Sequence, residues 1–338
     1  MTLWLVRAGK NGEQEESALT NNVAVIGWEE LPDLSSITTR ENLRELFEQT
    51  YPESKKNTTS NKVGQIWTFT NRIKKGDLVV LPLKHSSAVA VGVVKGPYSY
   101  RIDIAPNIRH TLPVDWLNTE IPRTAFDQDI LYSLGAFMTV CQIQRNNAEE
   151  RIRRVAFGKG TSSTTDTTPM GTDEEQIDIE QAARDQILDY INRKFKGHNL
   201  TRLIEAILEA EGYITMQSDP GPDGGVDILA GSGPMGFDSP RICVQVKSSQ
   251  SPVDVTVFRA LQGSLNSFNA DRGLLVSWGG FTRSVLSEAR RHYFSIRLWD
   301  SGEVIEALLK NYSVLPDTLQ AELPLKRVWS LVQEEDAD

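Results

Sequence analysis

Two different hydrophobic patterns divide the chain near residue 160. In the first half, short runs rich in β-branched residues are bounded by Gly, Pro and Asn, which is typical of strands. The predicted strands are Leu3–Arg7, Val23–Trp28, Asp77–Leu83 and Ala88–Val94. Thr38-Thr39-Arg40-Glu41 predicts a capping box before a helix that carries Leu43, Leu46 and Phe47, and a second helix is predicted at Lys62–Ile73. We expect a small β-barrel closed by helices.

The second half alternates helical periodicity with short apolar runs. A helix from about Glu174 to Lys194 precedes a helix on which Leu200, Leu203, Ile204, Ile207 and Leu208 recur at helical spacing before Gly212-Tyr213. The predicted strands that follow are Val226–Leu229, Arg241–Val246, Gly273–Ser277 and Ile296–Trp299. The predicted helices among them are Phe258–Phe268, Thr282–His292 and Glu303–Leu309. This order predicts an α/β domain around a central mixed sheet.

A run of small polar residues, Gly158–Pro169, cannot bury apolar surface and predicts a flexible linker. We therefore expect one domain at residues 1–155, a linker at 156–175 and a second domain at 176–312. Residues 313–338 would form an extension that ends in the acidic tail Glu334–Asp338.

Composition and charge narrow the classes of function. The net charge is -9, yet residues 190–300 hold twelve Lys or Arg against eleven Asp or Glu, so this stretch carries +1 and the rest -10. The balance neither favours nor excludes nucleic acid. Two distant cysteines exclude a disulfide scaffold and fit a reducing cytoplasm, and no apolar run is long enough for a membrane span.

Three side chains near two predicted strand ends carry candidate chemistry. Asp227 follows the turn Gly221–Gly225, and Gln245 and Lys247 share one face of the next strand because side chains two residues apart point the same way. Glu205 lies on the preceding helix. Asp223 could instead be the functional acid, with Asp227 a turn residue. Lys247 and Glu205 could equally be solvated surface residues.

This set suits hydrolysis of a phosphodiester bond. Mg²⁺ takes few protein oxygens, so Asp227, Gln245 and Glu205 could hold it, with Mn²⁺ as a possible substitute. A neutral Gln245 where a second carboxylate is common predicts modest metal affinity. Lys247 would neutralise charge that develops on the phosphate. No phosphate-loop motif is present, so we expect no nucleotide cofactor.

Residues 197–312 resemble the Mrr-like branch of the PD-(D/E)XK restriction endonucleases. The matching stretches are Glu211-Gly212-Tyr213, Pro222–Asp227, Val244-Gln245-Val246-Lys247, Leu274–Ser277 and Phe281-Thr282. The resemblance implies catalytic roles for Asp227, Gln245 and Lys247. It departs at the helix glutamate, which relatives carry where this chain has Leu200-Thr201; Glu205 comes one turn later.

The first half is rich in large aromatic residues, which would be barrel core or a pocket that stacks a flipped base. The order Trp4, Gly27-Trp28, Trp67, Gly76–Val79 resembles PUA-like domains, including the EVE type. That resemblance implies recognition of modified bases or RNA. We expect Trp28, Trp67 and Arg7 to line the pocket.

Together these features predict a modification-dependent restriction endonuclease that acts on double-stranded DNA in defence against foreign DNA. Cutting both strands requires two active sites, so a homodimer is expected. Arg283, Arg290 and Arg291 are either a solvated helix face or contacts to the DNA backbone. The alternatives are a nucleic-acid-binding module with an inactive or signal-gated nuclease-like domain, and an RNA-directed nuclease.

Overall fold

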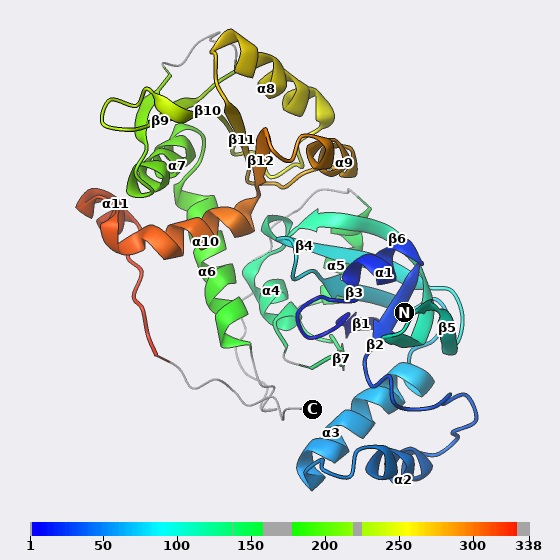
Figure 1. Ribbon diagram of the computed structural model, residues 1–338. Helices are drawn as coiled ribbons and strands as arrows, with labels where there is room; N and C mark the ends of the chain where they lie inside the picture. The colour runs from blue at the N-terminus through cyan, green and yellow to red at the C-terminus, as the bar shows by residue number, and fades with distance from the viewer. Residues whose placement is uncertain (1, 137, 158–177, 219–224, 330–338) are drawn as a thin grey trace. The chain divides into compact units, whose positions relative to one another are not determined.

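Two sheets, one in each half of the chain, organise the computed structural model (Figure 1). The structure describes residues 2–136, 138–157, 178–218 and 225–329. Two units are distinguished, Met1–Ala182 with Trp329–Asp338 and Ala183–Val328, and each is described by itself. Most of the predicted linker, Asp223 and the acidic tail lie outside the described residues. None of the helices described is long and apolar enough to cross a membrane.

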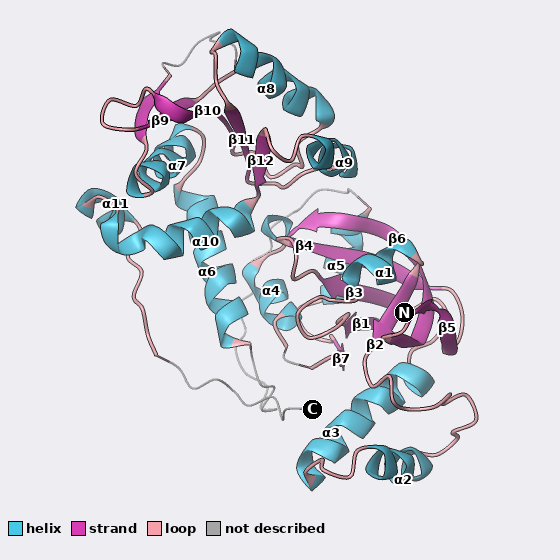
Figure 2. Ribbon diagram, in the orientation of Figure 1, coloured by secondary structure: helices cyan, strands magenta, loops and turns pink. Residues whose placement is uncertain are grey.

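The N-terminal unit contains a curled, seven-stranded sheet (Figure 2). Its strands are β1 (Leu3–Val6), β2 (Val23–Ile26), β3 (Leu78–Pro82), β4 (Ala88–Val94), β5 (Ser99–Ala105), β6 (Ile108–Pro122) and β7 (Val140–Gln142). The order is β2-β6-β4-β3-β1-β7, with β5 paired to β6. The first part of β6 pairs with β2 and β5 and its second part with β4, so this long strand bends the sheet into a half-barrel. The predicted fold class is confirmed, and β5 to β7 are additions to the predicted strands.

Helices cover both faces of this sheet. They are α1 (Glu15–Thr20), α2 (Arg40–Thr50), α3 (Lys56–Trp67), α4 (Gln128–Leu134) and α5 (Ala148–Ala156), with a π-helical turn at Thr68–Arg72 and a 3₁₀ turn at Arg123–Ala125. The cap of α2 is Thr39, whose hydroxyl accepts from the Asn42 N–H at 3.3 Å, so the cap lies one residue later than the predicted capping box. The second predicted helix starts earlier, at Lys56, and ends in the π turn.

Strand β1 shows why this sheet is buried on both faces. All four of its residues are buried. Trp4 and Val6 pack with α2 and α3 through residues such as Phe47, while Leu3 and Leu5 pack on the other face. A continuous apolar run is the pattern that such a doubly covered strand requires.

The C-terminal unit is built on a five-stranded mixed sheet in the order β12-β11-β10-β9-β8. The strands are β8 (Ile214–Gln217), β9 (Ile228–Ser232), β10 (Asp238–Lys247), β11 (Arg272–Ser277) and β12 (Ile296–Trp299). Strands β10, β11 and β12 run parallel, and β8 and β9 pair antiparallel. The helices are α6 (Ile179–Lys194), α7 (His198–Ala210), α8 (Val255–Ser267), α9 (Arg283–Arg291), α10 (Ser301–Asn311) and α11 (Asp317–Glu322), with a 3₁₀ turn at Tyr312–Val314.

Alternation along β10 separates two hydrophobic clusters, one on each face of the sheet. Val244 and Val246 pack in the cluster formed with α6, α7 and α10, which we call the α7 face. Cys243 packs with Phe258 of α8 and Val285 of α9, on the α8 face. The central mixed sheet between helices was predicted and is observed. The core of this unit also includes Leu315, Leu319 and Leu323, so it continues past residue 312.

Candidate active site

The C-terminal end of β10 presents Gln245 and Lys247 on the α8 face. Gln245 pairs with Leu275 and Lys247 with Ser277 on the parallel neighbour β11. Leu275 packs on the α8 face together with Cys243, and residues paired in register share a face. Gln245 is buried and Lys247 is half-buried. The two polar side chains therefore lie on one face, at the edge where the parallel strands end.

Asp227 is held against this strand end by two backbone contacts. Its N–H donates to the Val244 carbonyl at 2.8 Å, and its carboxylate oxygen Oδ2 accepts from the Val246 N–H at 2.7 Å. The accepted N–H belongs to the residue between Gln245 and Lys247. The half-buried carboxylate is thus fixed beside both by a short, charge-assisted hydrogen bond.

Gln245 has an unsatisfied buried oxygen. Its side chain is 5% exposed, and Oε1 has no hydrogen-bond partner among the described residues. The amide nitrogen lies beside Gly225, where an added Cβ would come within 2.9 Å of it and where φ is +77°. An orphaned acceptor of this kind costs about 1–3 kcal/mol. An amide oxygen next to a carboxylate is a donor set that suits Mg²⁺, so these residues fit a divalent ion.

The carboxylate count at this edge is low. The described part of the chain contains no group of three or more His, Cys, Asp or Glu side chains that could hold a metal. An ion here would depend on Asp227 and on the neutral oxygen of Gln245. Asp223, the alternative acid, falls in the segment 219–224 that is not described.

Glu205 does not join this group. It lies on α7, and the hydroxyl of Thr215 is within hydrogen-bond distance of Glu205 (3.2 Å) and of Glu209 (2.8 Å). Thr215 pairs with Ala230, which packs on the α7 face, whereas Gln245 and Lys247 occupy the α8 face. The one-turn offset from Leu200-Thr201 moves Glu205 about 6 Å along the helix axis. We therefore leave Glu205 out of the proposed ligands.

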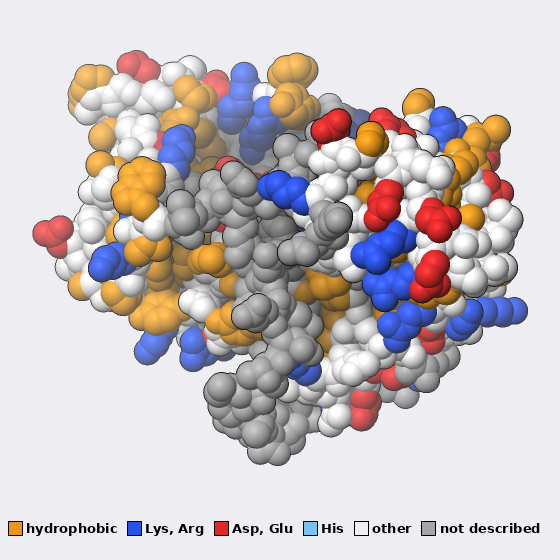
Figure 3. Space-filling view, turned by 90° about the horizontal axis from the view of Figure 1, so that it is seen from below, with side chains coloured by type: hydrophobic (Ala, Val, Ile, Leu, Met, Phe, Trp, Pro, Cys, Tyr) orange, Lys and Arg blue, Asp and Glu red, His pale blue; other side chains and the backbone are white. Residues whose placement is uncertain are grey.

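The three candidate backbone-contacting arginines lie on α9, which belongs to the α8 face. Arg283, Arg290 and Arg291 are exposed, and Val285 is the buried anchor of the helix. Arg291 lies 3.8 Å from Glu288. On the face drawn in Figure 3, acidic and basic side chains are interspersed, and neither sign covers it continuously.

In the N-terminal unit, Trp28 and Trp67 are half-buried and border the same hydrophobic cluster. Trp28 has φ of +63°, a left-handed conformation that is uncommon for a residue with a bulky side chain. Such outliers persist where the surroundings fix them. The carbonyl of Trp28 is within 3.1 Å of His110 Nε2.

His110 is the centre of a buried hydrogen-bond chain that sequence reasoning missed. Its Nδ1 is 2.8 Å from the Tyr98 hydroxyl, which accepts from the Leu34 N–H at 3.3 Å. A carbonyl can only accept, so Nε2 carries the proton and Nδ1 accepts from Tyr98. Burial lowers the pKa of His110 and raises that of Tyr98, which keeps both neutral. No motif marks His110, because its partners come from distant segments.

The side chain of Arg7 binds backbone carbonyl groups of the N-terminal unit. Its guanidinium donates to the carbonyl oxygens of Leu134 (3.0 Å) and Ala136 (2.8 Å), at the C-terminal end of α4. These hydrogen bonds join the residue after β1 to the end of α4, and their acceptors are backbone carbonyl oxygens. The expected role of Arg7 in a base pocket therefore loses its basis.

A family model matches the part of the chain that carries the candidate site. Residues 192–308 match the family model of the Mrr catalytic domain, described as a restriction endonuclease. This part of the chain is therefore similar to restriction endonuclease domains. Residues 4–139 match a domain of unknown function (DUF8426), which leaves the PUA or EVE resemblance a prediction. No curated protein matches the chain.

Three solved structures are similar at low identity. The protein of unknown function AF1548 is 15% identical over 37% of this chain and 77% of its own, with a TM-score of 0.29. The MspJI restriction endonuclease in complex with a 27-mer oligonucleotide is 13% identical, over 95% and 79%, with a TM-score of 0.33. The DNA modification-dependent restriction endonuclease AspBHI is 11% identical, over 80% and 74%, with a TM-score of 0.34.

Proposed function

We propose that this protein is a modification-dependent endonuclease that hydrolyses phosphodiester bonds of double-stranded DNA with Mg²⁺, or with Mn²⁺ in its place. The carboxylate of Asp227, hydrogen-bonded to the N–H between Gln245 and Lys247, is the observation that carries the proposal. It lies in the domain that matches the restriction endonuclease family. No nucleotide cofactor is required in this proposal.

Each residue at the strand end has a distinct role. Asp227 and the orphaned oxygen of Gln245 would hold the divalent ion. When bound, Mg²⁺ polarises a phosphoryl oxygen and lowers the pKa of water. Lys247 orients the attacking water and neutralises the charge that develops on the phosphate. Arg283, Arg290 and Arg291, exposed on α9, contact the DNA backbone.

The N-terminal unit would supply selectivity for a modified base. Trp28 and Trp67 offer aromatic surface at the margin of one cluster, suited to stacking a flipped base. The hydrogen bond from His110 fixes the backbone at Trp28, so the ring is held in place before DNA binds. A homodimer would place one active site on each DNA strand. Defence against foreign DNA, in the cytoplasm, is the biological role that such selectivity serves.

The test is cleavage of DNAs that differ only in cytosine or adenine modification, with Mg²⁺ or with EDTA. The expected result is cleavage of one modified DNA that EDTA abolishes and that Lys247→Ala abolishes. Lys326→Ala, an exposed lysine in the same unit, is the matched control and should cut normally. Cleavage that survives EDTA or Lys247→Ala would exclude this mechanism.

A second candidate is a nucleic-acid-binding module whose nuclease-like domain is inactive or gated by a signal. The neutral amide of Gln245, where a second carboxylate is common, and the position of Glu205 beside Thr215 favour it. Calorimetric titration with Mn²⁺ separates the two, because the nuclease requires binding that Asp227→Asn removes. An RNA-directed nuclease would use the same residues and would cut RNA in the same assay.

A further inference from the structure

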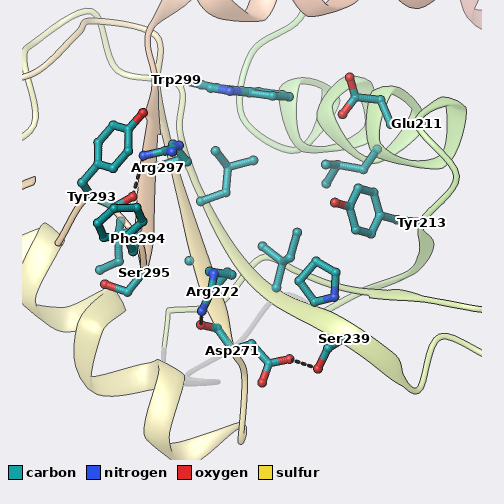
Figure 4. A pocket seen from close by; sticks show the side chains of 16 residues that line it. Glu211, Tyr213, Ser239, Asp271, Arg272, Tyr293, Phe294, Ser295, Arg297 and Trp299 are labelled. Carbon is teal, nitrogen blue, oxygen red and sulfur yellow. Dashed lines mark hydrogen bonds between the residues drawn. The ribbon is translucent and has the colours of Figure 1, made fainter.

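A second candidate site lies on the α7 face of the C-terminal sheet, opposite the α8 face that carries Gln245 and Lys247. A cavity of about 600 Å³ opens where β10, β11 and β12 begin and where α7 ends (Figure 4). Gln245 and Lys247 lie at the other end of the parallel strands. The lining continues along β12 to Trp299, which is paired with Val276, but it stays on the α7 face, whereas Gln245 and Lys247 lie on the α8 face. The cavity is therefore separate from the candidate active site.

The floor of the cavity combines arginines with apolar side chains. Arg272 pairs with Ile242, Leu274 with Arg297, and Val276 with Trp299. These pairings put both arginines and Trp299 on the α7 face, because Leu274 and Val276 pack there. Tyr213, after the end of α7, lines the cavity from the other side (Figure 4).

The acids that line the cavity are already paired. Glu211 accepts from Lys310 at 3.2 Å and from Asn311 at 3.3 Å. Asp271 accepts from the Arg241 N–H at 2.9 Å and from the Ser239 hydroxyl at 2.8 Å. Hydrogen bonds from Arg241 and Ser239 lower the pKa of Asp271 to about 2, so it stays ionised and engaged.

The two arginines on the cavity floor, Arg272 and Arg297, differ from these acids in that their hydrogen-bond partners are backbone carbonyls. Arg272 donates to the backbone carbonyl of Asp271 at 2.8 Å, and Arg297 donates to the carbonyl of Tyr293 at 2.5 Å. Within the described residues neither forms an ion pair with a carboxylate. Their side chains are anchored at one point, and their charge is uncompensated. The cavity thus favours an anionic group beside its floor.

Aromatic rings line the same space. The Arg297 guanidinium lies over the Tyr293 ring at 3.8 Å from its centroid. Phe294 is 82% exposed, and its ring makes an edge contact with Tyr293, with 5.3 Å between the two ring centroids. Trp299 and Tyr213 present further ring surface from opposite walls (Figure 4). A planar aromatic ligand could stack on these rings.

We propose that this cavity binds a nucleoside phosphate, either free or as the 5′-phosphorylated end of a single strand. The base stacks against Trp299 and Tyr213, and the phosphate contacts Arg272 and Arg297. The volume lies within the range of about 300–1,000 Å³ typical of small-molecule sites. The proposal does not rest on cleavage, since it involves none of Asp227, Gln245 and Lys247.

The experiment is calorimetric titration of the full chain in EDTA, so that no DNA is cut. The probes are dAMP, dCMP, the corresponding nucleosides, inorganic phosphate and a 5′-phosphorylated tetranucleotide. We expect nucleotide binding that weakens by about tenfold or more without the phosphate or without the base. Arg272→Gln and Arg297→Gln should each weaken it by a similar factor. Arg259→Gln on α8, also exposed, is the matched control and should bind normally.

Binding of mononucleotides alone identifies a free ligand, and binding of the tetranucleotide alone identifies a strand end. The proposal is overturned if no probe binds, if phosphate binds as well as nucleotides, or if both glutamine variants bind like the parent. Both arginines are exposed, so misfolding is not expected, and thermal unfolding checks this. Lys247→Ala should bind normally even if it cuts no DNA, which separates failure here from failure of the nuclease proposal.

Discussion

Two substitutions at Asp227 separate its contribution to folding from its proposed role in cleavage. Its carboxylate accepts the Val246 N–H at 2.7 Å, and Val246 is buried. Asp227→Ala leaves that N–H without its acceptor, at a cost of about 1–3 kcal/mol in the free energy of unfolding. Asp227→Asn keeps an oxygen that can accept, and exchanges a charge-assisted bond for a neutral one, so the cost should be about 1 kcal/mol.

Cleavage should respond differently. Both variants lose the negative charge that would hold the divalent ion, so both should cut at least about 100-fold more slowly, above the 10–100-fold effect of losing an outer partner of a metal ligand. Urea unfolding measures stability, and cleavage of a modified duplex over a range of Mg²⁺ concentrations measures activity. Asp317→Asn, an exposed carboxylate in the same unit, is the control. An Asp227→Asn protein that cuts at the parental rate would refute the assignment of Asp227 as a ligand.

Three further predictions concern other parts of the structure. Gln245→Leu removes the orphaned oxygen, so the free energy of unfolding should stay within about 1 kcal/mol while cleavage is lost; a variant that still cuts contradicts the ligand role. Gly231→Ala places a Cβ 1.8 Å from the Gly236 carbonyl oxygen and should destabilise by about 1–3 kcal/mol in urea. Gly263→Ala, on exposed helix with nothing within 4 Å, should instead stabilise by about 0.5–1 kcal/mol, and equal effects would disprove the clash. Burial lowers the pKa of His110 from 6.5, so the unfolded chain binds a proton at this residue before the folded chain does as the pH falls. The contribution of neutral His110 to the free energy of unfolding is therefore present above pH 6.5 and decreases as the pH falls below it. His110→Gln can keep both hydrogen bonds and should reduce the loss of stability between pH 7.5 and 5.5, and an unchanged difference between these pH values would count against this contribution.

Periodicity predicted the C-terminal unit well because its elements are short and strongly patterned. Ile296–Trp299 is observed with the predicted bounds, and β11 and α9 differ by a residue at their ends. The edge strand β8 was missed, since its exposed Ile214 and Met216 alternate with half-buried residues and give no apolar run. In the N-terminal unit, β6 was missed because a bent strand that changes partners has no single face to bury.

The candidate site, like the fold, could be predicted from the sequence only in part. Spacing along β10 is enough to predict that Gln245 and Lys247 share a face, because a strand has a fixed period. It is not enough for Glu205, whose position relative to them depends on which face of the sheet α7 covers. Arg7 and His110 show the same limit, since their hydrogen bonds join segments about a hundred residues apart or use a backbone carbonyl as acceptor.

The separate hydrophobic clusters of the two units bear on how such a chain could evolve. The clusters that hold Phe47 and Leu3 are made of residues before 157, and those that hold Val244 and Cys243 of residues after 187. A genetic crossover between the codons for residues 157 and 187 would transfer either set of packed side chains unchanged. Lineages could thus exchange the part of the gene that encodes the N-terminal unit without repacking the C-terminal unit, and substitutions in one would be inherited independently of the other.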